Sequence, residues 1–304
     1  MSRPTDKTNM PPKGSVFIKH ADYVLQHHDT YPAIDASKAD LSGKSMLIAG
    51  ASKGVGRMTA IRYAVAGCPK IAIAARSDLT EVERAVKEAA KANGRPEPQV
   101  LSLSMDVTSE DSVRSAAEAV EEAFGPSLDV LITNAGYLET WTPLTESDTK
   151  EWWRSWEVNI KGTYLTMRYL LPLVLKSETK TLVTLSSAGG HNTIPGGSAY
   201  QTSKFATCRL TEFADAEYGD QGLVAISLHP GGVKTELAFN MPEWLHHVLV
   251  DEPELPADVL VWLSRERREW LSGRFISACW DVNELEKKKG EITEKDALKF
   301  KMVF

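Results

Sequence analysis

The chain has 304 residues, of which 42% are hydrophobic and 25% are charged, and this composition excludes a disordered or fibrous protein. Its net charge of −6, without a basic stripe, excludes nucleic acid as the expected partner. Its three cysteines, Cys68, Cys208 and Cys279, are far apart and form no CxxC pair, so we expect reduced thiols, no disulfide framework and no metal site.

The lengths of the apolar runs indicate whether the chain has a signal peptide or a membrane-spanning segment. Residues 1–13 are polar and contain prolines, so they lack the apolar core of a signal peptide. The longest apolar run, 170–175, is too short to span a bilayer. We therefore expect a cytoplasmic protein that has no membrane span.

Composition divides the chain into three parts. Residues 1–40 form a predicted N-terminal arm that prolines and charged turns interrupt. Residues 41–280 alternate short apolar runs with amphipathic stretches, which predicts one domain of alternating strands and helices. Residues 281–304 are rich in charge, and we expect a solvated tail or surface helix rather than a partner-binding element.

The alternation of strands and helices predicts an α/β fold with a doubly wound, Rossmann-like parallel sheet. Right-handed crossovers place helices, such as those predicted at 81–92 and 112–124, on both faces of the sheet. The ligand crevice of such a sheet lies at the carboxyl ends of its strands. The seven predicted strands cover residues 45–50, 70–75, 100–105, 130–133, 181–185, 223–228 and 274–279.

The first predicted strand runs into a glycine-rich turn, Gly50-Ala51-Ser52-Lys53-Gly54-Val55-Gly56, and a predicted helix follows at once. Glycines allow a sharp turn and bring backbone amides close to a pyrophosphate, and the helix N-terminus favours an anion. The turn alone is a weak signal, but between a strand and a helix it predicts dinucleotide binding.

The end of the second strand indicates which dinucleotide binds. An NAD site usually has an acidic residue there, whereas this strand ends in Ala75, Arg76 and Ser77. Arg76 and Lys53 can bind a 2′-phosphate, and Asp78 is better explained as a turn residue. The sequence therefore predicts NADP(H) as the cofactor.

Tyr200 and Lys204 are four residues apart, which places both side chains on one face of a helix. A free phenol has a pKa near ~10, and a neighbouring ammonium favours the phenolate and makes the phenol a usable acid/base. Ser187 ends the fifth predicted strand and can bind a substrate oxygen. Ser186 is the alternative, but neighbouring strand residues point oppositely, so we favour Ser187.

These motifs together resemble the short-chain dehydrogenase/reductase family, in its single-domain branch, and the match covers residues 44–280 in order. The fungal members are the most similar, because residues 30–34 and 280–282 resemble theirs. One departure is Ala49, where the family usually has threonine, which puts the rigidity of the turn in doubt. The motifs that carry the resemblance are Gly50-x-x-x-Gly54-x-Gly56, Asn134-Ala135-Gly136, Asn159, Ser187, Tyr200-x-x-x-Lys204 and Pro230-Gly231.

The resemblance implies a role for each catalytic residue. Tyr200 would be the general acid in reduction, and Lys204 would lower its pKa and hold the nicotinamide ribose. Ser187 would polarise the substrate oxygen, and Asn159 would hold a water that relays protons. Asp106 would contact adenine with Val107 beside it. The expected cofactor-binding residues are Gly50, Ser52, Lys53, Gly54, Val55, Gly56, Arg76, Ser77, Asp106, Val107, Asn134, Ala135, Gly136, Tyr200, Lys204, Pro230, Gly231, Val233 and Thr235.

The apolar segment 236–256 is a hypothetical mobile lid over an apolar, ring-bearing substrate. His191 could face this substrate or could equally be a structural loop residue. A cluster at Trp152, Trp153 and Trp156 is better explained by packing or a subunit interface than by a ligand. The candidate substrate residues are Tyr137, Trp141, His191, Phe239, Met241 and Trp244.

The leading functional hypothesis is an NADPH-dependent ketone or aldehyde reductase that acts on a small molecule. One alternative keeps the site but oxidises an alcohol or epimerises its substrate. Another is a catalytically quiet NADP-binding module that regulates a partner, which the complete catalytic set disfavours. The resemblance also implies a homodimer or homotetramer and fits a role in secondary metabolism.

Overall fold

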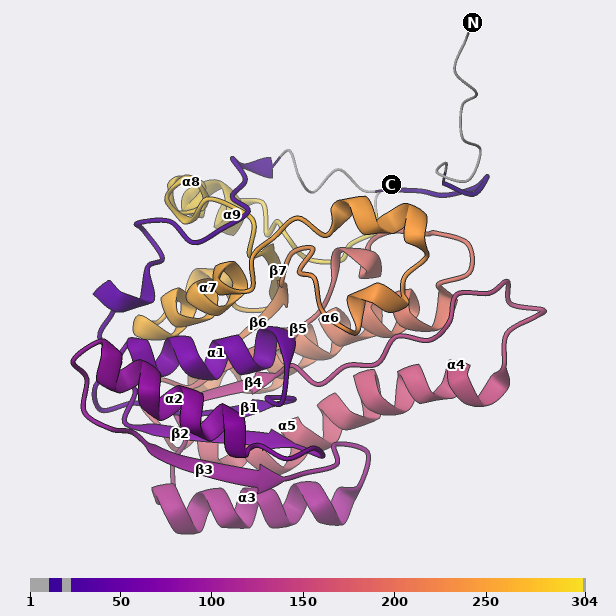
Figure 1. Ribbon diagram of the computed structural model, residues 1–304. Helices are drawn as coiled ribbons and strands as arrows, with labels where there is room; N and C mark the ends of the chain where they lie inside the picture. The colour runs from indigo at the N-terminus through magenta and orange to yellow at the C-terminus, as the bar shows by residue number, and fades with distance from the viewer. Residues whose placement is uncertain (1–10, 18–22, 303–304) are drawn as a thin grey trace, which may run out of the picture.

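A seven-stranded parallel sheet forms the centre of the protein (Figure 1). The computed structural model describes residues 11–17 and 23–302. The strand order is β3-β2-β1-β4-β5-β6-β7, and every neighbouring pair is parallel. This order confirms the predicted doubly wound α/β fold. The strands are β1 (Ser45–Ala49), β2 (Lys70–Ala75), β3 (Gln99–Ser104), β4 (Val130–Thr133), β5 (Thr181–Leu185), β6 (Val224–His229) and β7 (Arg274–Ser277).

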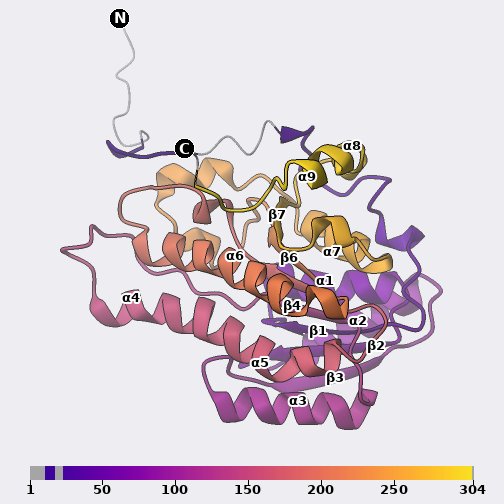
Figure 2. The same ribbon diagram turned by 180° about the vertical axis from the view of Figure 1, so that it is seen from behind.

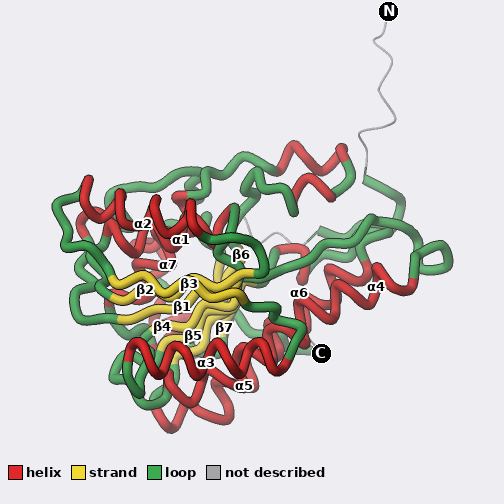
Figure 3. The backbone as a smooth tube through the Cα atoms, turned by 60° about the horizontal axis from the view of Figure 1, so that its bottom comes forward, coloured by secondary structure: helices red, strands yellow, loops and turns green. Residues whose placement is uncertain are grey.

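Helices cover both faces of the sheet (Figures 2 and 3). Met46 and Ile48 of β1 pack with the helices α1, α2 and α7, whereas Leu47 and Ala49 pack with α3 and α5. Successive strand residues point to opposite faces, so an unbroken apolar strand supplies both core layers. The helices are α1 (Gly54–Val65), α2 (Thr80–Ala92), α3 (Glu110–Phe124), α4 (Thr149–Trp156), α5 (Gly162–Val174), α6 (Ser198–Tyr218), α7 (Glu254–Arg265), α8 (Val282–Lys287) and α9 (Lys289–Glu294).

The predicted strands agree with the observed ones to within two residues at each end. The first strand ends at Ala49 because Gly50 adopts a φ of +88°, which extended strands do not contain. The helix predicted from residue 112 begins at Glu110, because the Ser109 side chain caps it by accepting a hydrogen bond from the backbone N–H of Ser112.

Parts of the predicted arm and tail belong to the core. Ile34 and Leu41, which precede β1, are buried against α1 and its neighbours. In the tail, α8 and α9 bury Val282, Leu285 and Ile292 in the same cluster. These segments are therefore surface helices, one of the two expected forms of the tail, with their charged residues on the outer side and their apolar residues buried.

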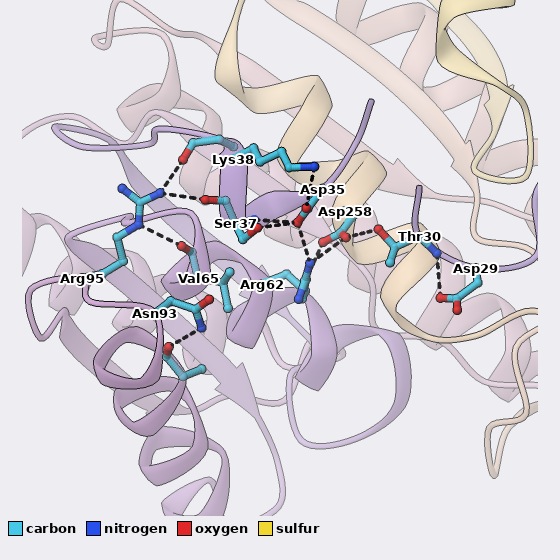
Figure 4. A network of polar contacts seen from close by, with 12 residues as sticks. Asp29, Thr30, Asp35, Ser37, Lys38, Arg62, Val65, Asn93, Arg95 and Asp258 are labelled. Carbon is cyan, nitrogen blue, oxygen red and sulfur yellow. Dashed lines mark hydrogen bonds and ion pairs between the residues drawn. The ribbon is translucent and has the colours of Figure 1, made fainter. Parts of the chain in front are cut away.

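A buried ion pair joins the arm to α1 and α7 (Figure 4). Asp258 on α7 is fully buried, and its Oδ2 accepts a hydrogen bond of 2.8 Å from Nη2 of Arg62 on α1. The Thr30 hydroxyl in the arm donates to the same carboxylate, and Asp35 lies 3.7 Å from Arg62. Because α1 starts at the glycine turn, this network fixes the helix that follows the turn.

The cysteines are free and buried, and burial raises the pKa of the Cys208 thiol to about 11. The hydroxyls of Ser186 and Ser227 form hydrogen bonds with the Cys208 thiol, and the charge of Lys204 on the same helix acts on it. Within the described residues, no helix combines the length and the apolar character that crossing a membrane requires.

Candidate active site

The glycine turn after β1 lies at the carboxyl edge of the sheet, where close contacts leave no room for side chains. A Cβ on Gly50 would lie 2.7 Å from the backbone of Ala135, and one on Gly56 would lie 2.1 Å from the carbonyl oxygen of Gly50. The Asn134 side-chain amide donates to the Gly50 carbonyl at 2.7 Å. Asn134, which directly follows β4, therefore holds the glycine turn in place. Ala49, the residue before the turn, has no hydroxyl that could form a similar hydrogen bond.

The start of α1 suits a phosphate group. Lys53 is the N-cap residue, no side chain caps this N-terminus, and its first turn contains no acidic residue. Backbone N–H groups and the helix dipole at such an end attract an anion. The turn and the helix thus fit the pyrophosphate of a dinucleotide.

The two residues predicted to contact the adenosine end of the cofactor lie just beyond the ends of β2 and β3. Arg76 is exposed directly after β2, and Asp106 follows β3. Burial opposes ionisation of Asp106, but hydrogen bonds from Thr108 and the charge of Arg76 outweigh it and hold the pKa of the carboxyl below its usual value. Val107 is buried against Gly162 at the start of α5.

Lys53 has a partner that the sequence did not predict. Its ammonium forms an exposed ion pair with Glu236, which lies beyond β6. Thr235 lies over the turn as well, because its Cγ2 would be 2.9 Å from a Cβ on Gly54. The segment after β6 therefore closes over the glycine turn.

Tyr200 and Lys204 both lie on α6, on the side that faces β5. The Lys204 Nζ is 5.7 Å from the centre of the Tyr200 ring and donates to the Leu185 carbonyl at 2.7 Å, where β5 ends. Ser187 follows two residues later and forms a hydrogen bond with Tyr200. Ser186 faces away, and its hydroxyl donates to the Lys204 carbonyl at 2.8 Å. The choice of Ser187 over Ser186 thus agrees with the geometry.

Burial is the largest influence on the pKa of Tyr200 and on that of Lys204. It raises the pKa of Tyr200 to about 12, although the hydrogen bond with Ser187 acts in the opposite direction. It also lowers the pKa of Lys204 to about 8. In the protein alone, the phenol is therefore protonated at neutral pH.

Asn159 lies in a π-helical turn, Glu157–Lys161, between α4 and α5. Its Oδ1 accepts from the backbone N–H of Tyr137, and its Nδ2 donates to the Tyr137 carbonyl and to Ser203 Oγ on α6. These bonds satisfy the buried amide, as its burial requires. Its side chain joins the loop after β4 to α6, and its relay water stays a prediction.

The segment after β6 carries Pro230, Gly231, Val233 and Thr235, and Asp251 supports it. The Asp251 Oδ2 accepts from the backbone N–H of Gly232 at 2.5 Å, and its Oδ1 lies 2.6 Å from His28 Nδ1. Asp251 carries no signal in the local sequence, because its partner His28 is 223 positions away and no pattern links them.

The candidate substrate residues do not all gather in one place. Phe239 contacts His246 edge-on, and both belong to the short 3₁₀ helices η7 (Ala238–Asn240) and η8 (Glu243–Val248). The ring of His191 instead packs against Phe275 and Phe300. This packing favours the structural alternative for His191, and a contact with substrate stays an untested prediction.

Tyr137 and Trp141 lie in the loop between β4 and α4. The Tyr137 hydroxyl donates to Glu151, and the guanidinium of Arg154 lies over its ring. Trp141 contacts Gly197 just before α6, because a Cβ on that glycine would lie 2.9 Å from the indole ring. Trp141 is therefore next to the N-terminus of α6, whereas Tyr137 lies against α4.

A parallel sheet with a glycine turn that fits an anion, a half-buried tyrosine beside a buried lysine and a nearby serine is the arrangement of an α/β oxidoreductase that uses a nicotinamide dinucleotide. Residues 44–246 match the family model described as short chain dehydrogenase. The chain belongs to the short-chain dehydrogenase family, whose members are oxidoreductases that act on CH–OH groups.

Relatives from fungi match most of the chain. The short chain dehydrogenase mpl6 of Monascus purpureus is 54% identical over 277 residues, which cover 91% of this chain and 94% of the relative. The short chain dehydrogenase pigC of Monascus ruber is 42% identical over 302 residues, which cover 97% and 99% of the two chains.

A solved structure has the same fold with a cofactor bound. It is a putative short chain dehydrogenase from Escherichia coli CFT073 complexed with NADPH, 27% identical with a TM-score of 0.69. The match covers 81% of this chain and 99% of that one.

Proposed function

We propose that this protein is an NADPH-dependent reductase of ketones or aldehydes. The observation that carries the proposal is the approach of Ser187 and Lys204 to the Tyr200 phenol at the end of β5. The same edge of the sheet carries the glycine turn, so a bound nicotinamide and a substrate carbonyl can meet there.

When bound, NADPH supplies the hydride that reduces the carbonyl carbon. The Ser187 and Tyr200 hydroxyls donate hydrogen bonds to the carbonyl oxygen, where negative charge develops. Tyr200 then gives its proton to that oxygen, and Lys204 stabilises the phenolate that remains. The raised pKa of Tyr200, about 12, supports reduction, because the hydroxyl carries its proton at neutral pH.

The proposed preference for NADPH rests on Arg76 and Lys53. Neither the end of β2 nor the glycine turn carries an acidic residue in position to bind a ribose 2′-hydroxyl. Glu236 competes for Lys53 in the protein alone, so Arg76 is the main expected partner of the 2′-phosphate. The solved relative with bound NADPH supports the same choice.

Arg76→Ala tests this preference. We expect the Kd of NADPH to rise about 10-fold or more, because a charge-assisted bond to phosphate contributes roughly 1.5–3 kcal/mol. The Kd of NADH should change by less than about twofold. Fluorescence titration measures both, and Arg84→Ala is a matched control, because Arg84 is an exposed arginine paired with Glu81 and Glu88 on α2. Equal weakening of both cofactors would contradict the role of Arg76.

The proposed substrate is an apolar, bulky or ring-bearing carbonyl compound. Phe239, Met241 and Trp244 lie in the segment beyond β6, and Tyr137 and Trp141 lie in the loop beyond β4. Segment 236–256 would act as a lid, because it follows the residues that lie over the glycine turn.

A screen of NADPH oxidation over aliphatic, aromatic and polycyclic ketones tests the function, with NADH in parallel. We expect turnover with NADPH, fastest for ring-bearing ketones. Turnover confined to small aliphatic ketones would contradict the substrate proposal. NADPH binding without turnover of any carbonyl or alcohol would instead favour the regulatory module.

A further inference from the structure

A buried carboxylate lies directly behind the catalytic tyrosine. Glu139, in the loop between β4 and α4, is only 4% exposed. Its Oε1 accepts from the backbone N–H of Tyr200 at 3.0 Å, and its Oε2 accepts from the Ser155 hydroxyl at 2.6 Å. One carboxylate thus joins the loop after β4, the helix α4 and the first turn of α6.

No cation neutralises this carboxylate. In residues 11–17 and 23–302, no ion pair includes Glu139. Its compensation comes from two hydrogen bonds and from the N-terminus of α6, which begins at Ser198 and favours a negative charge. A buried charge that lacks a cation is costly, so its presence beside Tyr200 calls for a functional explanation.

The charge of Glu139 acts on the phenol of Tyr200. Burial is the largest cause of the raised pKa of Tyr200, Ser187 opposes it, and the negative charge of Glu139 adds to it. Other titratable groups lie on the helices next to the phenol. On α6, Lys204 faces the Tyr200 ring, and Cys208 acts on Lys204. On α4, Glu151 accepts a hydrogen bond from the Tyr137 hydroxyl and forms an ion pair with Arg154.

We propose that Glu139 is a positioning residue that fixes the first turn of α6 and keeps the Tyr200 hydroxyl protonated until the substrate oxygen takes its proton. Glu139 and Lys204 then act on Tyr200 in opposite directions. Lys204 stabilises the phenolate after the transfer, and Glu139 prevents early loss of the proton. Carbonyl reduction consequently persists to higher pH, and alcohol oxidation requires higher pH. The inference rests on the proposed reductase function.

Glu139→Gln tests the role of the charge. Glutamine has the same shape, and its carbonyl oxygen can still accept from the Tyr200 N–H. We expect the alkaline decline of kcat/KM for reduction to move down by roughly 0.5–1 pH unit, since one buried negative charge is lost. The matched control is Glu146→Gln, because Glu146 is an exposed glutamate in the same loop and should leave the profile unchanged.

Glu139→Asp separates charge from geometry. The shorter side chain keeps the charge but disturbs the hydrogen bonds, so we expect a lower kcat with an alkaline decline at the wild-type pH. If Glu139→Gln lowers kcat and leaves the decline in place, Glu139 is only structural and the proposal fails.

A substrate-free measurement keeps this inference distinct from the proposed function. Tyrosinate absorbance is titrated in the wild type and in Tyr200→Phe, and the difference reports Tyr200 alone. The same difference is measured between the Glu139→Gln variant and the double variant that carries both Glu139→Gln and Tyr200→Phe. We expect Tyr200 to titrate at lower pH in the Glu139→Gln background than in the wild type, even if no carbonyl substrate is found. Coincident titrations would overturn the proposal.

Discussion

Tyr200→Phe is expected to lower kcat for carbonyl reduction by about 10²–10⁴-fold, the usual contribution of a positioned acid. The variant removes one hydroxyl, which supplies both the proton and a hydrogen bond to the substrate oxygen. The ring keeps its place in the half-buried first turn of α6, where Glu139 accepts a hydrogen bond from the backbone N–H of residue 200. The Kd of NADPH should therefore stay within about twofold of the wild-type value, since a lone neutral hydrogen bond contributes only ~0.5–1.5 kcal/mol.

Steady-state kinetics and fluorescence titration of NADPH measure the two effects separately. Tyr164→Phe provides the matched control, because it removes the hydroxyl of a half-exposed tyrosine on α5. We expect this control to retain wild-type kcat. An equal loss of turnover and NADPH binding in Tyr200→Phe would point to a structural role. Unchanged turnover would contradict the assignment of the acid.

Asp258→Ala is expected to lower the free energy of unfolding by about 3–5 kcal/mol. The change leaves the Arg62 guanidinium with only Asp35, 3.7 Å away, as a carboxylate partner, and it leaves the Thr30 hydroxyl without its acceptor. It also loosens the arm from α1 and α7 (Figure 4). Urea unfolding measures the change, and Glu81→Ala, which breaks an exposed pair with Arg84, should cost less than about 1 kcal/mol.

The pKa of Asp258 adds a second expectation. Burial raises it above the usual value, although Arg62 and Thr30 act in the opposite direction. Burial of the carboxylate therefore opposes its ionisation more than Arg62 and Thr30 favour it. We expect the double variant Arg62→Met with Asp258→Leu, which replaces both charges by apolar groups, to lower the free energy of unfolding less than Asp258→Ala alone. A double variant that is less stable than the single one would contradict this account.

The local patterns of the sequence predicted the sheet well because they depend on neighbouring residues. Apolar runs define all seven strands to within two residues, and the glycine turn ends β1 where expected. Tyr200 and Lys204 lie on one face of α6, as their four-residue spacing on a helix requires. The roles of the catalytic residues stay predictions until the variants are measured.

Contacts between distant segments were beyond the reach of these patterns. Glu139 and Tyr200 are 61 positions apart, and no periodicity or motif connects them. Asp251 supports Gly232 and contacts His28 of the arm, which the sequence had assigned to a separate part of the chain. His191 follows Ser187 closely, yet its ring turns to Phe275 and Phe300.

The sequence by itself determined the order of strands and helices along the chain, the glycine-rich turn after β1 and the pairing of a phenol with an ammonium on one helix. These features arise from side-chain periodicity and backbone conformation, which act over a few residues. Only the tertiary structure decided which charges surround Tyr200 and which segments hold α1 and the loop after β6. Those contacts form when the chain folds, because burial in the assembled sheet and helices brings distant polar groups together and requires each to find a partner.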